Sequence, residues 1–534
     1  MLVRQLICFL LFVTSAWGLK FFFYNPRSTR SHVNFVNKII TVLTDAGHEV
    51  VSYNPEISKD FGSTYNHKKA RVIEWEVPFE PKVSVDNLNQ NEWEMGASMS
   101  EIMGEIARIF KHFGKACDYQ LRDEKLMATL RAEKFDLGRL SEFFDPCGFG
   151  IMKKIGLTNT VGMMTTTLPP IAIGMLGIPS MSSFVPDMTM PLIPPFGFIG
   201  RLKIQLINII GKYVSFNYLL SHVQDAFDAH NLNITIDNVF ADSSLFLINN
   251  DEYVDDLRRL IDFPQPISYK MIPIAGVGLA KNLANPKKLE TNLQKAFDSS
   301  VKGVVYISFG SVANAYKMPA KTKQAFLDAV RAFPDITFLF KYERDDLTEG
   351  KPKNLILSKW FSQPDILAQP KLLAFVTHAG GNSMTEAHFS GVPVVAIPLF
   401  TDQPRNALLA KFRGVGIIVS KQNITRDALV EAIHEIITNS NYKQNAIDLA
   451  KMVRDKPMNA DERVLKYLAF AAKYEDVAKN MDLPGRYMST IEFYNIDVFA
   501  FLFTAFILTL LTIVFSVRIA IRLCLKNNQK NKTE

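Results

Sequence analysis

"AFVTHAGGNSMTEAHFSGVPVVAIPLF", residues 374–400, joins an apolar run, a glycine-rich turn and a helix-like segment. The apolar run ends at His378, and the helix pattern begins near Asn382. A hydrolase nucleophile elbow needs Gly-x-Ser-x-Gly at such a junction, but Thr385 stands where the second glycine would be. A metal site is disfavoured because no second His or Cys stands at ligand spacing. The free N–H groups of a helix start, together with the two glycines, favour a cradle for an anion.

Short apolar strands alternate with helix patterns in both halves of the chain. The first half opens with "LKFFFYNP" (19–26), a helix pattern over about 31–46, and "HEVVSY". In the second half the same alternation recurs, with strand patterns at 302–311, 336–342, 354–360, 372–378 and 393–398. Such alternation predicts parallel sheets covered by helices on both faces. We therefore expect two α/β domains, joined by a linker within 280–300.

Two apolar segments indicate a membrane protein that enters the secretory route. The first eighteen residues combine a basic start, an apolar centre and a small-residue cleavage site, which is typical of a signal peptide. Residues 498–517 contain no charge and, at ~1.5 Å per residue, are long enough to cross a ~30 Å hydrocarbon core. Arg518 and Arg522 follow, so the positive-inside rule predicts a cytosolic tail and a luminal body.

Charge and cysteine content narrow the function classes. The net charge is +7, but the tail 518–534 holds five basic residues and one acidic residue. The luminal body is nearly neutral, which gives no electrostatic reason to expect nucleic acid. Cys117 and Cys147 are the cysteines of the luminal part, and whether they are bridged stays open. The sequons at Asn233 and Asn423 fit the secretory route.

The segment 194–216 is apolar but is interrupted by Arg201, Lys203 and Lys212. One interpretation is a buried or pocket-lining helix, and the other is a surface that dips into the membrane. We favour the buried or pocket-lining helix.

The flanks of the glycine-rich turn carry a family resemblance. Upstream lies "WFSQPDIL" (360–367) and downstream "PLFTDQPRNA" (398–407). With the turn between them they resemble the signature of the UDP-glycosyltransferases, the family that contains the glucuronosyltransferases. "FGSV" (309–312), "PSMSSFVP" (179–186), "AGHEV" (46–50) and the single C-terminal span also have counterparts in that family. The resemblance implies a GT-B fold, in which two Rossmann-like domains face a cleft and the C-terminal one binds the sugar nucleotide.

We divide the chain into six parts on this basis. They are a signal peptide (1–18), an N-terminal acceptor-binding domain (19–285), a C-terminal UDP-sugar-binding domain (286–445), C-terminal helices with a juxtamembrane segment (446–497), a transmembrane helix (498–517) and a cytosolic tail (518–534).

The resemblance also implies roles for the donor-site residues. Trp360 would stack on uracil, and Gln363 would hydrogen-bond the ribose region. Glu386 would accept hydrogen bonds from the ribose hydroxyls. Asp402 and Gln403 would hydrogen-bond the sugar.

The diphosphate would be held without a metal. Side chains and backbone N–H groups would reach its oxygens. These are Ser311 and His378 for the side chains, and Gly380, Gly381, Asn382 and Ser383 for the cradle. The chain has no Asp-x-Asp motif, so a metal-bridged diphosphate is not expected.

The catalytic base is expected across the cleft, since ligands of parallel α/β sheets lie beyond the carboxyl ends of the strands. His32 matches the family's Ser-His step, sixteen residues before the His of "GHEV". At a helix N-terminus the dipole disfavours imidazolium, which keeps His32 able to accept a hydroxyl proton.

The chain departs from the family pattern at two places. Mammalian members place an Asp, the partner of the base, where this chain has Ser141. Glu142 is our candidate for that partner, with Asp145 as the alternative. Gln265 stands where relatives often carry Arg near the donor, which predicts altered diphosphate binding or sugar choice.

The resemblance implies inverting transfer of glucuronate or glucose from a UDP-sugar to a hydroxyl of a small lipophilic acceptor, with no cofactor beyond the UDP-sugar co-substrate. The alternatives are a UDP-glucosyltransferase for a defined endogenous lipid, and a non-catalytic membrane protein that binds UDP-sugar or lipophiles. Lys530 and Lys532 resemble a dilysine-type retrieval signal. They favour a single-pass type I protein of the endoplasmic-reticulum membrane with luminal catalytic domains. Donor sugar, acceptor, sequon occupancy and oligomeric state, a homo-oligomer included, stay open.

Overall fold

The structure is a computed structural model. It describes residues 18–27, 30–57, 67–79, 93, 99–139, 145–165, 168, 170–186, 192, 194, 196–211, 218–251, 265–279, 283, 287–311, 313–475 and 480–530. The expected signal segment up to residue 17 lies outside the described residues, as does Lys532.

The N-terminal domain contains a parallel sheet of seven strands in the order β3-β2-β1-β4-β5-β6-β7. These strands are β1 (Lys20–Tyr24), β2 (Glu49–Glu56), β3 (Arg71–Glu76), β4 (Leu137–Arg139), β5 (Thr160–Met164), β6 (Leu245–Ile248) and β7 (Met271–Pro273). Its helices are α2 (Arg30–Asp45), α3 (Met99–Arg122), α4 (Glu124–Ala132), α5 (Cys147–Ile155), α6 (Pro170–Met175), α7 (Phe198–Gly211), α8 (Ser221–Ala229) and α9 (Ile236–Asp242).

The C-terminal domain contains a parallel sheet of six strands in the order β10-β9-β8-β11-β12-β13. These strands are β8 (Gly303–Ser308), β9 (Ile336–Lys341), β10 (Leu355–Ser358), β11 (Leu372–Thr377), β12 (Val394–Ala396) and β13 (Gly416–Ile418). Its helices are α11 (Thr291–Ser299), η4 (Ala315–Lys317), α12 (Ala320–Arg331), α13 (Gln363–Leu367), α14 (Gly381–Ser390), α15 (Gln403–Phe412), η5 (Lys421–Asn423), α16 (Arg426–Thr438) and α17 (Ser440–Arg454). The chain ends with α18 (Ala460–Lys473), η6 (Pro484–Tyr487), α20 (Thr490–Phe493) and α21 (Ile496–Lys530).

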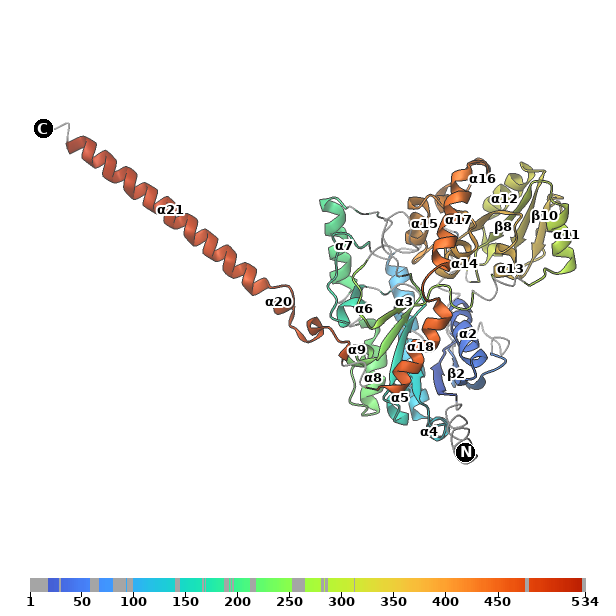
Figure 1. Ribbon diagram of the computed structural model, residues 1–534, viewed down its shortest axis with the longest axis horizontal. Helices are drawn as coiled ribbons and strands as arrows, with labels where there is room; N and C mark the ends of the chain where they lie inside the picture. The colour runs from blue at the N-terminus through green and yellow to red at the C-terminus, as the bar shows by residue number, and fades with distance from the viewer. Residues whose placement is uncertain are drawn as a thin grey trace, which may run out of the picture.

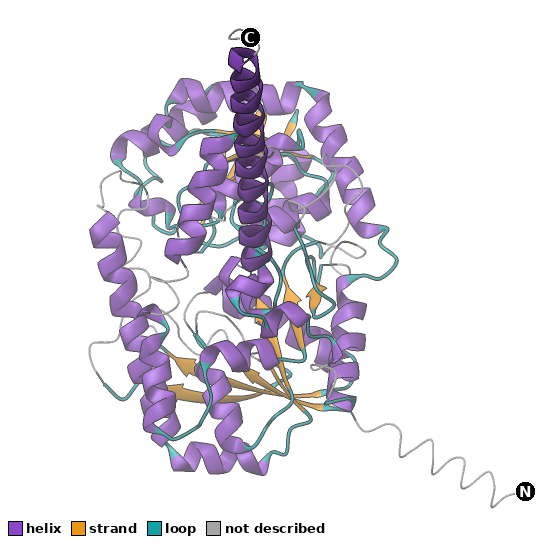
Figure 2. Ribbon diagram, turned by 90° about the vertical axis from the view of Figure 1, so that its left-hand side faces the viewer, coloured by secondary structure: helices purple, strands orange, loops and turns teal. Residues whose placement is uncertain are grey.

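The interior strands are apolar on both faces, which explains why helices cover both sides of each sheet. Four of the five residues of β1, "KFFFY", are buried, and all six of β8, "GVVYIS", are buried. A strand of this kind is stable only when both faces are packed. Figure 2 shows the helices on both sides of the strands in each domain. The predicted α/β class with two Rossmann-like domains is confirmed.

The chain after α17 returns to the N-terminal domain. Helix α17 packs on the C-terminal core through Leu449 and Val453, but α18 packs on the N-terminal core through Val464 and Leu468. The Asn159 side chain also donates to the Ala471 carbonyl at 2.6 Å. Figure 1 shows α18 beside α2. The two domains are therefore connected twice, once between β7 and α11 and once between α17 and α18.

Trp93 joins the domains a third time. It lies between β3 and α3 in the chain but belongs to the core of the C-terminal domain, where it is 8% exposed. Its ring packs edge-on against Phe309 with centroids 4.8 Å apart, and its Nε1 donates to the Asn314 carbonyl at 3.1 Å. The N-terminal part of the chain thus supplies part of the core beneath the end of β8.

The sequence favoured a buried or pocket-lining helix for this segment, and α7 lines a cavity but is mostly exposed. Of its residues only Ile204 is buried. The exposed apolar side chains of this helix are Phe198, Ile199, Leu202, Leu206, Ile209 and Ile210. On its inner side, Ile204 and Asn208 do line a small cavity. Burial was predicted wrongly because the apolar residues of α7 are spread around the whole helix. Composition alone therefore does not identify the face that packs.

Helix α21 is the candidate membrane span. Within the described residues, one helix is long and apolar enough to cross a membrane, over Ile496–Leu525. Its mean hydropathy is 2.7, and none of it is buried in the protein. It extends away from both domains (Figure 1). Before it, Gly485 packs against Gly177 of the N-terminal domain so closely that a Cβ at Gly485 would lie 2.8 Å from the Gly177 carbonyl oxygen. The segment entering the span is therefore fixed to the N-terminal domain.

Cys117 and Cys147 form a disulfide that joins α3 to the start of α5. Both residues are fully buried, and their Cα atoms lie 5.5 Å apart. The bridge that the sequence left open is present.

Replacing both cysteines by alanine should lower the free energy of unfolding of the N-terminal domain by about 3–4 kcal/mol, because the bridge closes a loop of sequence separation 30. Urea unfolding of the full chain in detergent, followed by circular dichroism, measures the change. The matched control is Cys524→Ala, which removes an exposed free thiol. An unchanged unfolding midpoint in the double variant would contradict the expectation.

Candidate functional site

The turn between β11 and α14 holds a strained backbone. Ala379 has φ 63° and is fully buried, and Thr401, in the next loop, has φ 50°. Left-handed conformations of this kind are costly for residues with a Cβ and persist where surrounding contacts fix them. Asn406 provides such contacts: its Nδ2 donates to the Ala379 carbonyl at 3.0 Å and to Asp402 Oδ2 at 2.8 Å. One side chain, which the sequence analysis missed, thus joins the two loops.

Two glycines make room for the ring of His378. A Cβ at Gly310 would lie 2.7 Å from His378 Cε1, and a Cβ at Gly380 would lie 2.5 Å from His378 Nε2. No other residue fits at either position without displacing the imidazole. A Cβ at Gly381, in contrast, would lie 3.5 Å from Asp402 Oδ2, an ordinary contact. The glycines therefore seat a histidine in the turn, in addition to exposing backbone N–H groups.

His378 is neutral at physiological pH. Burial, reinforced by the positive charge of Lys341, lowers its pKa to about 4. Lys341 Nζ donates to the Gly310 carbonyl at 2.8 Å, so the cation is fixed beneath the loop that carries Ser311. The imidazole can donate a hydrogen bond here, but it carries no charge with which to attract an anion.

Glu386 lies in the second turn of α14 and is already held by two partners. Gln363 Nε2 donates to Glu386 Oε2 at 2.8 Å and to Ser383 Oγ at 3.1 Å. Lys38, from α2 of the other domain, donates to Glu386 Oε1 at 2.8 Å. The structure thus brings together three of the predicted donor-site residues and adds Lys38, which no sequence motif pointed to.

The remaining predicted residues of this domain differ in exposure. Trp360 follows β10 and is 61% exposed, so its indole is not part of the core. Ser311 is half-buried at the end of β8. Gln403 is buried, and its Oε1 accepts from the N–H groups of Leu399 at 2.9 Å and Phe400 at 3.1 Å. The carbonyl group of Gln403 therefore holds the loop after β12.

The cradle helix touches the turn that contains His32. Asn382 Nδ2 donates to the Ser31 carbonyl at 3.4 Å, and Asn249 Nδ2 donates to Asn382 Oδ1 at 3.1 Å. His32 is half-buried in the first turn of α2, next to Ser31. The two predicted halves of the site, 350 residues apart in the chain, therefore meet at α14.

The partner of His32 stays a prediction. Glu142 lies outside the described residues. Asp145 is buried and accepts from the Tyr24 hydroxyl at 3.1 Å and from the Cys147 N–H at 3.3 Å. Tyr24 ends β1, the strand that precedes the His32 loop, so Asp145 lies at the same sheet edge.

Gln265 does not lie at the donor turn. It lines the small cavity beside α7, together with Ile204 and Asn208. The expected effect of this residue on diphosphate binding therefore has no support from its position.

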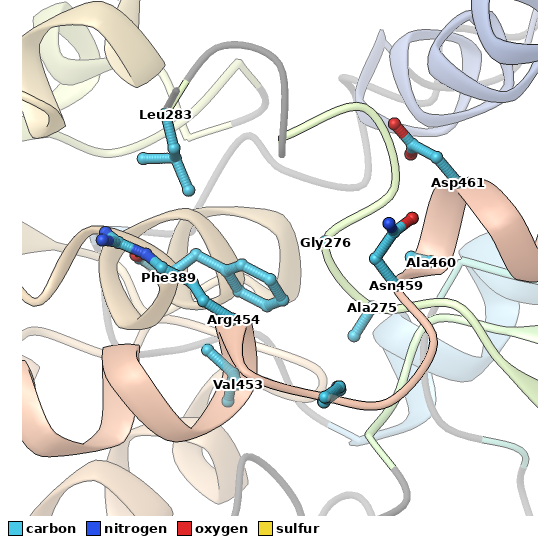
Figure 3. Close-up of a pocket in the computed structure, with 10 residues that line it drawn as sticks. Ala275, Gly276, Leu283, Phe389, Val453, Arg454, Asn459, Ala460 and Asp461 are labelled. Atoms are coloured by element: carbon cyan, nitrogen blue, oxygen red, sulfur yellow. The ribbon is translucent and has the colours of Figure 1, made fainter. Parts of the chain in front are cut away.

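A cavity of about 260 Å³ lies where the chain crosses between the domains. Figure 3 shows Phe389 at the end of α14 on one side and Asn459 and Asp461 at the start of α18 on the other. The cavity is thus separate from the cradle at the opposite end of α14. Among the described residues no group of His, Cys, Asp and Glu could hold a metal ion.

Comparison with known proteins decides the family. Residues 26–531 match the family described as UDP-glucoronosyl and UDP-glucosyl transferase. The chain belongs to this family. It is therefore a glycosyltransferase that moves a sugar from a UDP-sugar to an acceptor with inversion at the anomeric carbon.

Relatives of this glycosyltransferase share nearly its whole length. Rat UDP-glucuronosyltransferase 1A1 is 26% identical over 518 residues, which are 93% of this chain and 91% of the relative. Rabbit UDP-glucuronosyltransferase 2C1 is 26% identical over 486 residues, covering 89% and 93%. The solved structure of a UDP-glucosyltransferase from Polygonum tinctorium superimposes with a TM-score of 0.57 at 15% identity, over 86% of this chain and 99% of that one. The structural likeness supports the GT-B fold.

His388 is a buried histidine that the glycosyltransferase site does not use. It lies in α14, is 2% exposed, and neither ring nitrogen has a hydrogen-bond partner in the described part of the chain. Burial, with a contribution from Arg413, lowers its pKa to about 3.

Replacing His388 by leucine should raise the free energy of unfolding at pH 7 by about 1–3 kcal/mol, since a buried unsatisfied polar group is removed. Between pH 6.5 and 3 the unfolded chain binds a proton that folded His388 does not, so the wild type loses stability as pH falls through this window. At pH 5 that loss is about 2 kcal/mol, and the variant lacks it. Urea unfolding at pH 7 and pH 5 measures both effects, with the exposed His434→Leu as control. Equal pH dependence in wild type and variant would refute the assignment.

Proposed function

We propose that the protein transfers glucuronate or glucose from a UDP-sugar to a hydroxyl group of a small lipophilic acceptor, on the luminal side of the endoplasmic-reticulum membrane. The contact between Asn382 and the Ser31 carbonyl carries the proposal, because it brings the cradle helix against the turn of His32. A donor held at α14 would then present its anomeric carbon to an acceptor beside α2.

The donor would be held along the carboxyl edge of the C-terminal sheet. Trp360 offers an exposed indole on which uracil can stack, an interaction worth about 1–3 kcal/mol per base. Gln363 and Glu386 lie together where ribose hydroxyls would bind. Asp402 is fixed by Asn406 and is better placed to accept from sugar hydroxyls than Gln403, whose carbonyl is already engaged.

The leaving diphosphate would be stabilised by hydrogen bonds and by the helix dipole. The N–H groups from Gly380 to Ser383 open α14, and the neutral His378 can add one donor, as can the Ser311 hydroxyl. His32 would accept the proton of the acceptor hydroxyl as its oxygen attacks the anomeric carbon. The bond to UDP breaks on the opposite face, which inverts the α-linked donor to a β-glycoside.

Replacing His32 by alanine should lower kcat/KM by roughly 10²–10⁴-fold, the usual contribution of a general base, while the Kd for UDP stays within about twofold. The assay measures turnover with UDP-glucuronate and UDP-glucose against a panel of phenolic and lipophilic alcohol acceptors. His434→Ala, an exposed histidine on α16, is the matched control.

Two outcomes separate the proposals. Full activity of His32→Ala would remove His32 as the base and leave the transferase intact. UDP binding by the wild type without turnover of any donor and acceptor pair would favour the non-catalytic binding protein.

The luminal location is supported by three features. The buried Cys117–Cys147 bridge suits an oxidising compartment. Asn233 and Asn423 of the two sequons are exposed, so a transferase could reach both. The apolar helix α21 would anchor the body as a type I protein, with Lys530 in the cytosolic tail.

Endoglycosidase H treatment of microsomes should therefore increase the gel mobility of the protein, and Asn233→Gln and Asn423→Gln should each remove one mobility step. Protease added to sealed microsomes should remove the tail alone. A body that is unglycosylated and digested in sealed microsomes would place the domains in the cytosol and refute this location.

A further inference from the structure

Lys38 forms an ion pair between the two domains inside the site. Its Nζ lies 2.8 Å from Glu386 Oε1, although 348 residues separate the two in the chain. The side chains are 28% and 10% exposed, so the pair is partly shielded from water. Such pairs are less screened by salt than surface pairs.

The ion pair gives the second oxygen of the Glu386 carboxylate a partner. Gln363 Nε2 holds the other oxygen, Oε2, at 2.8 Å. One oxygen is thus fixed from within the C-terminal domain and one from the N-terminal domain. With both oxygens fixed, the carboxylate has one orientation, and each oxygen still has a free lone pair for a ribose hydroxyl.

The stem of Lys38 crosses the connection between the domains. A Cβ at Gly278 would lie 3.2 Å from Lys38 Cβ, and Gly278 has φ +73°, a conformation that side chains disfavour. The Gly278 N–H donates to Asp461 Oδ1 of α18 at 2.7 Å. Lys38 therefore contacts the connection between β7 and α11 directly. That connection is in turn hydrogen-bonded to α18, the helix that follows the connection after α17.

Helix α14 is also held by the N-terminal domain one turn earlier. Asn382 contacts the Ser31 carbonyl at 3.4 Å and Asn249 Nδ2 at 3.1 Å. The contacts at Asn382 and Glu386 lie on the two turns of α14 that form the cradle. Opening of the cleft would break these contacts together.

We infer that Lys38 is a positioning residue for the UDP-sugar: it orients the Glu386 carboxylate toward the ribose and holds the cleft closed over the donor. This inference rests on the proposed donor site. Lys38 also balances the charge of Glu386. Without it, a partly buried carboxylate would face the anionic diphosphate, and like charges at short range oppose binding.

The test compares Lys38→Met, which keeps the stem and removes the charge, with Lys38→Arg, which keeps the charge. Lys38→Met should raise the Kd for UDP and the KM for the UDP-sugar about tenfold, as expected for loss of a hydrogen bond to a charged group. Its kcat should change less than about threefold. Lys38→Arg should restore most of the affinity.

A double-mutant cycle with Glu386→Gln tests the coupling. If Lys38 acts through Glu386, adding Lys38→Met to Glu386→Gln should cost less than about twofold further in Kd. Lys302→Met, which breaks an exposed ion pair with Asp335, is the matched control and should leave Kd unchanged. Titration calorimetry of UDP into the full chain in detergent gives all the Kd values.

The outcomes distinguish this inference from the proposed function. A wild type that does not bind UDP would overturn both. A wild type that binds UDP, with Lys38→Met within twofold of it, would overturn only the role of Lys38. If the losses of UDP affinity caused by Lys38→Met and Glu386→Gln add fully in the double variant, that role is also overturned, because Lys38 would then act independently of Glu386.

Discussion

The ring of His378 fills the space that side chains at Gly310 and Gly380 would need. The end of β8 and the turn after β11 therefore both pack against this ring. Next to the ring, Ala379 has a left-handed conformation, and α14 begins directly after Gly380, whose N-cap position has no side-chain cap. The loop after β12 is then joined to the same turn by Asn406. The proposed anion cradle would thus be built by backbone packing around one neutral imidazole.

The cradle also depends on the other domain. Lys38, Ser31 and Asn249 each contact α14, and Trp93 fills the core beneath the end of β8. Parallel sheets place their functional loops at the carboxyl ends of the strands, and here two such edges face each other. The site is therefore a property of the closed pair of domains.

Much of this was predictable from the sequence, and the reasons for the rest are physical. "KFFFY" and "GVVYIS" predict buried strands because continuous apolar runs must be covered on both faces. The ordered motif from Trp360 to Gln403 predicts which loops meet, since its parts follow three strands of one sheet, β10, β11 and β12. Lys38 and Asn406 carry no such signal, because their roles come from contacts across space. The burial of helix α7 was misjudged because its apolar residues do not form one stripe. The hydrogen bond accepted by the Gln403 side-chain carbonyl depends on a loop conformation that no local sequence pattern specifies.

The return of α18 to the N-terminal core has a consequence for how the two domains could be exchanged between relatives. A recombination event that exchanged only the chain before the linker would leave a foreign α18 against the new N-terminal core, with Val464 and Leu468 facing unmatched neighbours. A transferable N-terminal domain in this protein therefore consists of two separate pieces of chain, one before the linker and one after α17. Gene fragments joined at the linker alone would combine poorly, whereas fragments that carry both pieces preserve the core.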